Sequence, residues 1–307
     1  MAPMMSLPER MGLRLLNAQG LRSRWFDTRV GRVHALEAEG RGELPPVVLL
    51  HGLSANAAAY GGYLKRMLPH CQRVIAPDMP GHGLSEVPRG GLDRDTMLQG
   101  GFEALDRLVE APAIVVGNSM GGLGAIRYAL ARPEKVRALV LVSPGGAPMP
   151  EPAFQRFLDT FRIRSHDDAL GFVDRIFAEP PRLVRHALAA AVRDRFTNDA
   201  LRGLLDGITA DDMLKPEELT ALRVPILLIW GLEERVLPRS HLAFFADHLP
   251  EHARIEEWSK FGHVGFLERT EEVALRTVRF ARGLSHASPR RAPSTLIRER
   301  DTIAPSP

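Results

Sequence analysis

The stretch AIVVGNSMGG, residues 113–122, decides the fold of this 307-residue chain. An apolar run ends at Gly117-Asn118-Ser119-Met120-Gly121, and the pattern of residues 123–131 predicts a helix. The order is strand, G-x-S-x-G, helix, in which a sharp turn raises the serine hydroxyl above the sheet. The flanking glycines are needed because a side chain there would collide with the neighbouring strand and helix. The pattern predicts Ser119 as a nucleophile; the alternative is a glycine-rich turn that only joins two elements.

Strand-like and helical segments alternate along most of the chain. Residues 32–37 alternate as a strand does, and continuous apolar runs typical of buried strands occur at 46–50, 73–76, 113–116, 138–142 and 225–230. Amphipathic segments of helical length lie at 57–68, 95–110, 120–132 and 239–249. This alternation predicts an α/β fold with a mostly parallel sheet flanked by helices.

One interval, residues 148–218, has helical patterning and no strand-like run. Its apolar residues recur at helical spacing, and five phenylalanines could line a pocket or, as we favour, pack the helices together: Phe154, Phe157, Phe161, Phe172 and Phe177. We predict a helical cap over residues 148–218, inserted into a core formed by 1–147 and 219–284. Residues 285–307 are rich in Pro, Ser and Arg without a period, which predicts a disordered tail.

The composition excludes several classes of protein. Hydrophobic residues make up 45% and charged residues 25%, as in globular proteins, and the formal charge is only +3 without a basic run in the periodic part. Nucleic-acid binding is therefore not expected. Cys71 is the only cysteine, which excludes internal disulfides and cysteine metal clusters. Arg10 and Arg14 interrupt the apolar patches at the start, and no apolar run could span a membrane, so we expect a cytoplasmic enzyme.

Residues 24–283 resemble the α/β-hydrolase superfamily, because further segments follow the serine in the order acid, then histidine. The strand end Leu49–Ser54 resembles the oxyanion loop of that superfamily. The resemblance implies that the backbone N–H groups of Leu53 and Met120 stabilise the oxyanion. It also implies that His51 shapes this loop rather than acting as the base.

The same resemblance indicates the base and the acid. Residues 261–268, FGHVGFLE, resemble the histidine loop of the superfamily and imply His263 as the general base. The usual aspartate is absent after strand 225–230, and an alignment on Trp230-Gly231 and Pro238 puts Glu234 in its place. The alternative acid is Glu233 or another carboxylate. Asp78 and His82 precede the serine, so they are not expected to form the catalytic pair.

The implied activity is hydrolysis of a carboxylic ester through an acyl-serine, because the motifs are most similar to the monoacylglycerol-lipase-like branch and its bacterial lipase relatives. The expected partner is a small acyl ester such as a monoacylglycerol, and no cofactor or metal is expected. Peripheral membrane contact through the cap and the oligomeric state stay open. The elbow also resembles carbon–carbon bond hydrolases of ring-fission products, although their Gly-Pro-Gly after His-Gly is absent. A non-catalytic ligand receptor is the third alternative.

Overall fold

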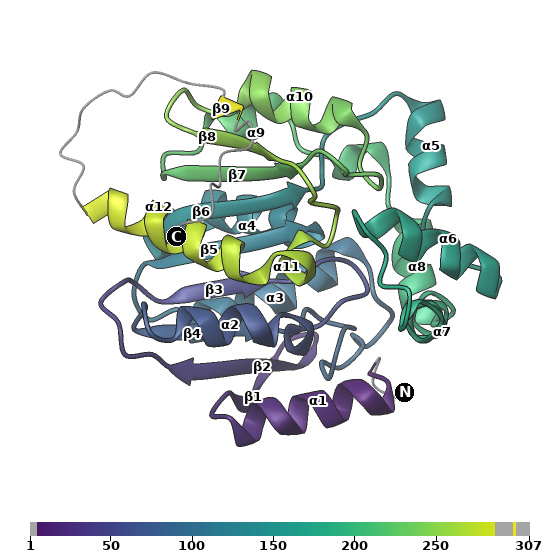
Figure 1. Cartoon of the computed structure of the whole chain (residues 1–307), viewed down its shortest axis with the longest axis horizontal. Coiled ribbons are helices and arrows are strands. Elements are labelled where there is room, and N and C mark those ends of the chain that lie inside the picture. Colours follow the sequence, from purple (N-terminus) through teal and green to yellow (C-terminus); the bar gives the residue numbers. More distant parts are fainter. Residues whose placement is uncertain (1–4, 286–296, 299–307) are drawn as a thin grey trace, which may run out of the picture.

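A single twisted sheet organises the chain, of which the computed structural model describes residues 5–285 and 297–298 (Figure 1). The strand order is β1-β2-β4-β3-β5-β6-β7-β8-β9, with β1 and β2 antiparallel to their neighbours and all later pairs parallel. The strands are β1 (Arg22–Thr28), β2 (Gly31–Glu39), β3 (Val47–Leu50), β4 (Arg73–Pro77), β5 (Ala113–Ser119), β6 (Val136–Pro144), β7 (Ile226–Gly231), β8 (Arg254–Trp258) and β9 (Ile297–Arg298). The α/β class with a mostly parallel sheet is confirmed.

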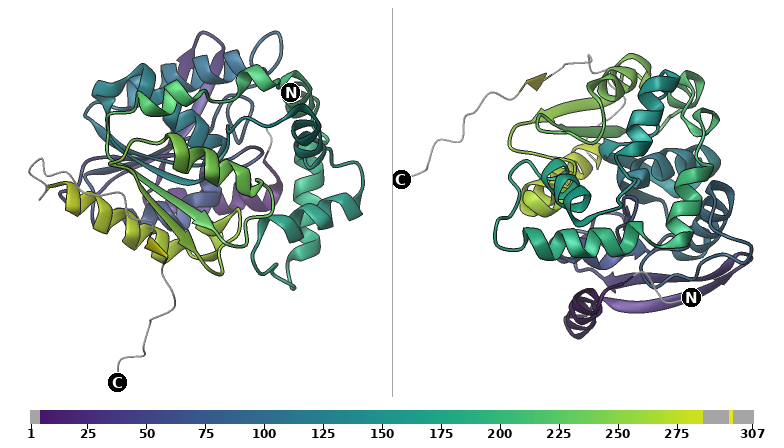
Figure 2. Two further views of the ribbon diagram at one scale, coloured as in Figure 1. Left: turned by 90° about the horizontal axis from the view of Figure 1, so that it is seen from above. Right: turned by 90° about the vertical axis from the view of Figure 1, so that its right-hand side faces the viewer.

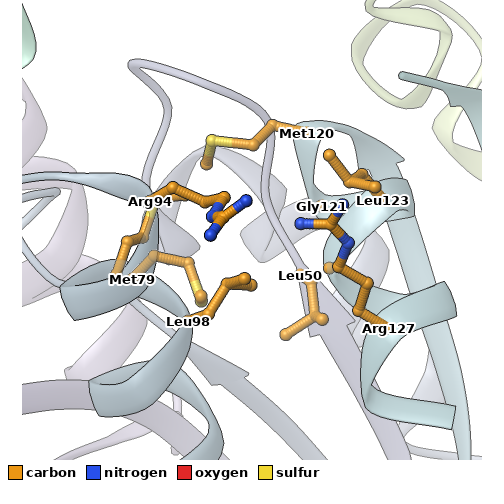
Figure 3. Close-up of a pocket in the computed structure, with 10 residues that line it drawn as sticks. Leu50, Met79, Arg94, Leu98, Met120, Gly121, Leu123 and Arg127 are labelled. Atoms are coloured by element: carbon orange, nitrogen blue, oxygen red, sulfur yellow. The ribbon is translucent and has the colours of Figure 1, made fainter. Parts of the chain in front are cut away.

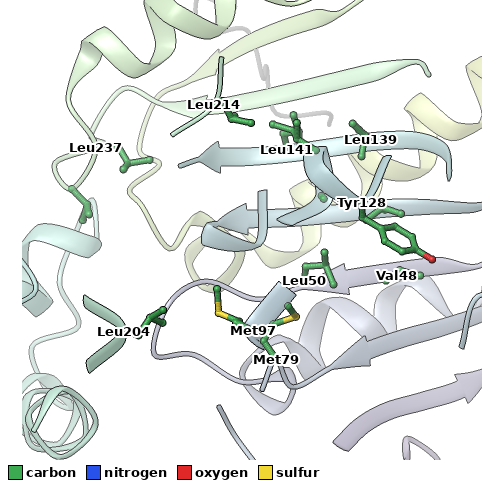
Figure 4. Close-up of a cluster of buried hydrophobic side chains, with 14 of the residues drawn as sticks. Val48, Leu50, Met79, Met97, Tyr128, Leu139, Leu141, Leu204, Leu214 and Leu237 are labelled. Carbon is green, nitrogen blue, oxygen red and sulfur yellow. The ribbon is translucent and has the colours of Figure 1, made fainter. Parts of the chain in front are cut away.

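Helices cover both faces of the sheet, as the continuous apolar runs require. In Figure 1 the front face carries α1 (Leu7–Ala18), α2 (Gly61–Met67), α11 (Gly265–Glu268) and α12 (Thr270–Ser285), and the rear face carries α3 (Arg94–Leu108) and α4 (Met120–Ala131). Side chains of β3 alternate between the two cores. Val47 and Leu49 join the core under α2 and α12, whereas Val48 and Leu50 join the core of α3 and α4 (Figure 4). The sheet is therefore held between two apolar cores, one on each face.

An all-helical excursion separates β6 from β7, as the sequence predicts. It contains α5 (Glu151–Asp159), α6 (His166–Ile176), α7 (Arg185–Phe196), α8 (Asp199–Gly207), η3 (Ala210–Asp212) and α9 (Pro216–Thr220). Helices α5 to α8 lie at the side of the molecule to which the carboxyl ends of the parallel strands point, toward the viewer in Figure 2 (right). Three of the phenylalanine rings pack on one another: the ring centroid of Phe161 is 5.1 Å from that of Phe157 and 5.9 Å from that of Phe172. Phe154 packs instead with Leu158 and Met213. The proposed boundary at residue 218 falls inside α9, which packs against α10 (Arg239–His248) of the core.

The ends of the chain add features that the sequence analysis did not predict. Helix α1 and strand β1 precede the first strand expected at 32–37. Besides η3, the connecting segments contain the 3-10 helices η1 (Ala57–Tyr60) and η2 (Pro133–Lys135). The predicted tail, 285–307, lies outside the described residues except for Ser285 and the two-residue strand β9. Among the helices that the structure describes, none has the length and apolar character needed to cross a membrane.

Candidate active site

Ser119 lies on a sharp turn where β5 ends and α4 begins. Its backbone angles are φ 54° and ψ −120°, a region that side chains rarely adopt. A Cβ on Gly121 would lie 2.1 Å from the carbonyl oxygen of Leu50, so only glycine lets α4 start this close to β3. The turn holds Ser119 partly exposed above the carboxyl edge of the sheet, as the motif predicts.

The loop after β3 touches this turn. A Cβ built on Gly52 would lie only 3.5 Å from the Cβ of Ser119, so the loop that carries Leu53 approaches the serine turn. Within residues 5–285, the backbone N–H groups of Leu53 and Met120 have no protein acceptor. His51 shapes this loop: its Nε2 accepts from the Met79 N–H at 3.0 Å, so its Nδ1 donates to the Gly52 carbonyl at 2.8 Å. Both ring nitrogens are used, which leaves His51 no free base.

Glu234 and His263 form a buried hydrogen-bonded pair. Nδ1 of His263 donates to Oε2 of Glu234 at 2.8 Å, and the two side chains are 9% and 1% exposed. Because a carboxylate only accepts, the ring proton is on Nδ1 and the lone pair is on Nε2. Burial raises the pKa of the Glu234 carboxyl, but the His263 imidazole and the backbone N–H groups of Leu237 and Val236 outweigh burial and hold the pKa below its ordinary value. The carboxylate therefore stays ionised.

Asn118 joins the serine turn to the histidine loop. Its Nδ2 donates to the carbonyl oxygens of His263 (3.2 Å) and Val142 (3.0 Å), and its Oδ1 accepts from the Tyr60 hydroxyl at 3.0 Å. Asn118, the residue before the serine, thus fixes the backbone of the histidine loop at His263. In the described part of the chain, no hydrogen bond joins Ser119 Oγ to His263 Nε2. Such contacts often form only once substrate is bound.

The other candidate carboxylates are engaged elsewhere. Glu233 accepts from the Phe261 N–H at 3.0 Å through Oε2 and does not bind His263. Asp78 is buried and binds Nδ1 of His34 at 2.8 Å, not His82, whose Nδ1 lies 3.1 Å from the Pro80 carbonyl. Asp78 also accepts from the Ala57 and Leu84 N–H groups, so it fixes loops near the site.

A small apolar cavity of about 30 Å³ lies beside Met120, between α3 and α4 (Figure 3). Met79, Leu98 and Leu123 contribute to its lining, together with the side chains of Arg94 and Arg127. Both guanidinium groups bind Asp212 in η3: Arg94 pairs with its carboxylate, and Arg127 donates to its carbonyl oxygen. The excursion between β6 and β7 is therefore fastened to the core next to the serine turn.

Sequence reasoning missed three residues that hold the site together. Asn118 occupies a variable position of the motif, and Tyr60 lies far from it in the chain. Glu268 ends the histidine loop, and its carboxylate accepts from the N–H groups of Gly262 and Ala178. Only the asparagine could have been noticed, as the polar residue between the strand and the serine. Across the described residues, no group of three or more His, Cys, Asp or Glu side chains is placed to hold a metal.

Comparisons with known proteins identify the relatives of this chain. Residues 45–270 match the family described as serine aminopeptidase, S33. Lipase 1 of Psychrobacter immobilis is 26% identical over 241 residues, covering 75% of this chain and 74% of the lipase. The 2-hydroxy-6-oxo-6-phenylhexa-2,4-dienoate hydrolase of Burkholderia cepacia is 27% identical, covering 76% and 85%.

A solved structure supports the fold. A serine hydrolase from Cycloclasticus zankles superposes with a TM-score of 0.75 at 23% identity, covering 87% of this chain and all of that one. This likeness concerns the fold, whereas the family match spans most of the chain. The chain belongs to the serine aminopeptidase, S33, family and is a serine hydrolase of the α/β-hydrolase fold.

Proposed function

We propose that this protein hydrolyses carboxylic esters through an acyl-serine intermediate, with Ser119 as nucleophile, His263 as base and Glu234 as the orienting acid. The observation that carries the proposal is the 2.8 Å hydrogen bond between Glu234 and His263. It fixes the tautomer in which Nε2 can accept a proton, on a loop tied to the serine turn through Asn118.

The proposed reaction follows from these positions. Ser119 Oγ attacks the ester carbonyl while His263 Nε2 takes its proton, and the proton then passes to the leaving alcohol. The N–H groups of Leu53 and Met120 stabilise the oxyanion. One such donor typically contributes about 10²–10³-fold to kcat. Water, activated by the same imidazole, then releases the acid from Ser119.

The substrate is proposed to be a small acyl ester, of which a monoacylglycerol is one candidate. The cavity beside Met120 is lined mainly by apolar side chains, which suits hydrocarbon. At about 30 Å³ it has room only for the start of an acyl chain, since ligand pockets span about 300–1,000 Å³. The cap proposed for residues 148–218 would enclose the substrate, since Asp212 is held by both Arg94 and Arg127 at this cavity.

The second candidate is cleavage of a carbon–carbon bond in a ring-fission product. It is favoured by the similarity to the Burkholderia cepacia hydrolase, which is 27% identical to this chain where the lipase is 26% identical. Two features weigh against it: Ser54 and Ala55 stand where those hydrolases carry the rest of their Gly-Pro-Gly, and Val264 follows the histidine instead of tryptophan.

One substrate panel separates these functions. Wild type and Ser119→Ala would be given p-nitrophenyl esters of increasing chain length, a monoacylglycerol, an aminoacyl p-nitroanilide and a vinylogous 1,5-diketone. We expect turnover of esters by wild type and its loss in Ser119→Ala, with unchanged circular dichroism. Turnover of the diketone alone would establish the second candidate, and the anilide alone a peptidase. Turnover of none would point to a receptor.

A further inference from the structure

Helix α1 turns an apolar stripe away from the protein. Leu7, Met11 and Leu15 are 71%, 61% and 59% exposed. They are spaced by four residues, so they lie along one face of this 12-residue helix. Large apolar residues gathered on one exposed face mark interaction surfaces more often than singly scattered ones do.

The opposite face of α1 packs against the protein. The exposure of Leu7, Met11 and Leu15 therefore does not arise because the helix is detached from the core. Leu13 is buried, and a Cβ on Gly61 would lie 2.6 Å from the Leu16 side chain. A capping box of Ser6 and Glu9 closes the first turn. These contacts fix the rotation of α1 about its axis and leave the apolar stripe in water.

The charges beside the stripe have one sign. Arg10 and Arg14 are exposed, and within the described residues neither forms an ion pair. The only acidic residue of α1, Glu9, points inward, where it pairs with Arg195 of α7 and accepts from Asn56 at 2.7 Å. The outer face of α1 therefore combines apolar side chains with two uncompensated positive charges.

We propose that α1 binds the surface of an anionic lipid bilayer. Amphipathic helices with basic flanks lie in the headgroup layer, where the apolar face is buried and Arg contacts lipid phosphate. A second copy of the chain fits less well. The face of α1 is about 18 Å long and about 10 Å wide, far below the roughly 800 Å² per partner of stable interfaces. A second α1 would also place its arginines next to Arg10 and Arg14 without a carboxylate between them, so the two helices would repel each other.

The position of α1 links this surface to the active site. Glu9 bridges Asn56, three residues beyond the oxyanion residue Leu53, to Arg195 in the cap helix α7. In Figure 1 the first turn of α1 lies at the same side of the molecule as α7. A bilayer bound by α1 therefore lies beside the seam between cap and core.

The test measures binding to vesicles of phosphatidylcholine alone or with 30% phosphatidylglycerol, by co-sedimentation at low and high salt. Wild type and Ser119→Ala should bind the anionic vesicles equally, with affinity falling as salt rises. The triple variant Leu7→Ser, Met11→Ser, Leu15→Ser should lose binding. Arg10→Gln with Arg14→Gln should weaken binding about 30-fold, since each basic residue near the surface contributes about fivefold.

A matched control is Leu275→Ser, which removes a leucine that is 42% exposed on α12 and should leave vesicle binding unchanged. Turnover of soluble p-nitrophenyl acetate by the α1 variants and by Leu275→Ser checks folding, because none of the residues changed in them touches the site. Equal vesicle binding by the triple variant, or no binding by wild type, would overturn the proposal. The proposal would also be overturned if light scattering showed a dimer for wild type and a monomer for the triple variant. A second copy of the chain would then cover the stripe.

Discussion

Glu234 shows how a longer acid can occupy the place of the usual aspartate. Its Oε1 accepts from the N–H groups of Val236 at 2.8 Å and Leu237 at 3.0 Å, which leaves Oε2 for His263. The turn after β7 thus fixes the carboxylate through its own backbone. Three hydrogen bonds remove the freedom that the extra methylene would give, so the orientation of the imidazole does not depend on an aspartate.

Replacement of this carboxylate should impair the chemical step. Glu234→Gln keeps the shape but can donate to Nδ1, which favours the tautomer with its proton on Nε2, and kcat should fall about 10³–10⁴-fold. Glu233→Gln is the matched control, because Glu233 accepts only from the Phe261 N–H and should keep kcat within about threefold. Ester hydrolysis at saturating substrate measures both. A large loss in Glu233→Gln with an active Glu234→Gln would transfer the role to Glu233.

The sequence indicated the residues that we propose to react, but not the residues that hold them in place. Ser119, Glu234 and His263 are recognisable because each stands in a local motif after a strand. Tyr60 and Glu268 act through contacts between distant segments: the Tyr60 hydroxyl donates to Asn118, and the Glu268 carboxylate accepts from the Ala178 N–H. No local pattern encodes such pairs, because they depend on where β3, β5 and the cap meet.

At the scale of elements, the histidine loop and the cap are clamped together. One oxygen of Glu268 accepts from the Gly262 N–H at 2.8 Å and the other from the Ala178 N–H at 2.7 Å. A Cβ on Gly262 would lie 2.5 Å from the Ala178 nitrogen, and Val264 donates to the Ile176 carbonyl at 3.1 Å. The segment after α6 therefore packs directly against the backbone on both sides of His263. We expect these contacts to help position the imidazole.

Removal of this clamp should affect catalysis more than binding. In Glu268→Ala the N–H groups of Gly262 and Ala178 lose their acceptor, and each unmet bond costs about 1–3 kcal/mol when water cannot replace it. We expect kcat to fall about tenfold with a smaller change in KM, because His263 is less well placed. Glu271→Ala, at an exposed position of α12, is the control. A lower Tm with unchanged kcat would show that Glu268 only supports the fold.

The elements that the sequence predicted are those with a regular apolar pattern, either a continuous run or an amphipathic period. Strand β7 was expected at 225–230 and lies at Ile226–Gly231, and α10 was expected at 239–249 and lies at Arg239–His248. Strand β1 was missed because it is an edge strand whose residues are half-buried or exposed on both faces. Helix α1 was missed because its apolar residues do not all face the core, so burial did not impose a recognisable period.

At the scale of the whole molecule, buried histidines make stability depend on pH. Burial is the main cause that lowers the pKa of His82 to about 3 and of His241 to about 4, and it also lowers the pKa of His51. The unfolded chain binds protons near the ordinary value of 6.5, whereas the folded chain does not. Stability is therefore complete above pH 6.5 and falls on acidification toward the folded pKa values.

Urea unfolding between pH 7 and pH 4.5 should reveal this dependence. Each of these histidines should lower the free energy of unfolding by up to about 1.4 kcal/mol per pH unit below 6.5. In His82→Leu, which removes one such group together with its unpartnered Nε2, the slope should be shallower by about one proton. A free energy of unfolding that is flat from pH 7 to pH 5 would contradict the assignment of neutral buried histidines.

Catalysis at this site requires that the serine turn, the turn after β7 and the histidine loop meet, so that His263 activates Ser119. The most direct test is labelling with a fluorophosphonate probe, followed by peptide mass spectrometry of wild type and His263→Ala. The account predicts stoichiometric modification of Ser119 in wild type and a loss of at least 100-fold in labelling rate in His263→Ala, as expected on order-of-magnitude grounds for removing a general base. Modification of a different residue, or equal labelling rates in the two proteins, would contradict it.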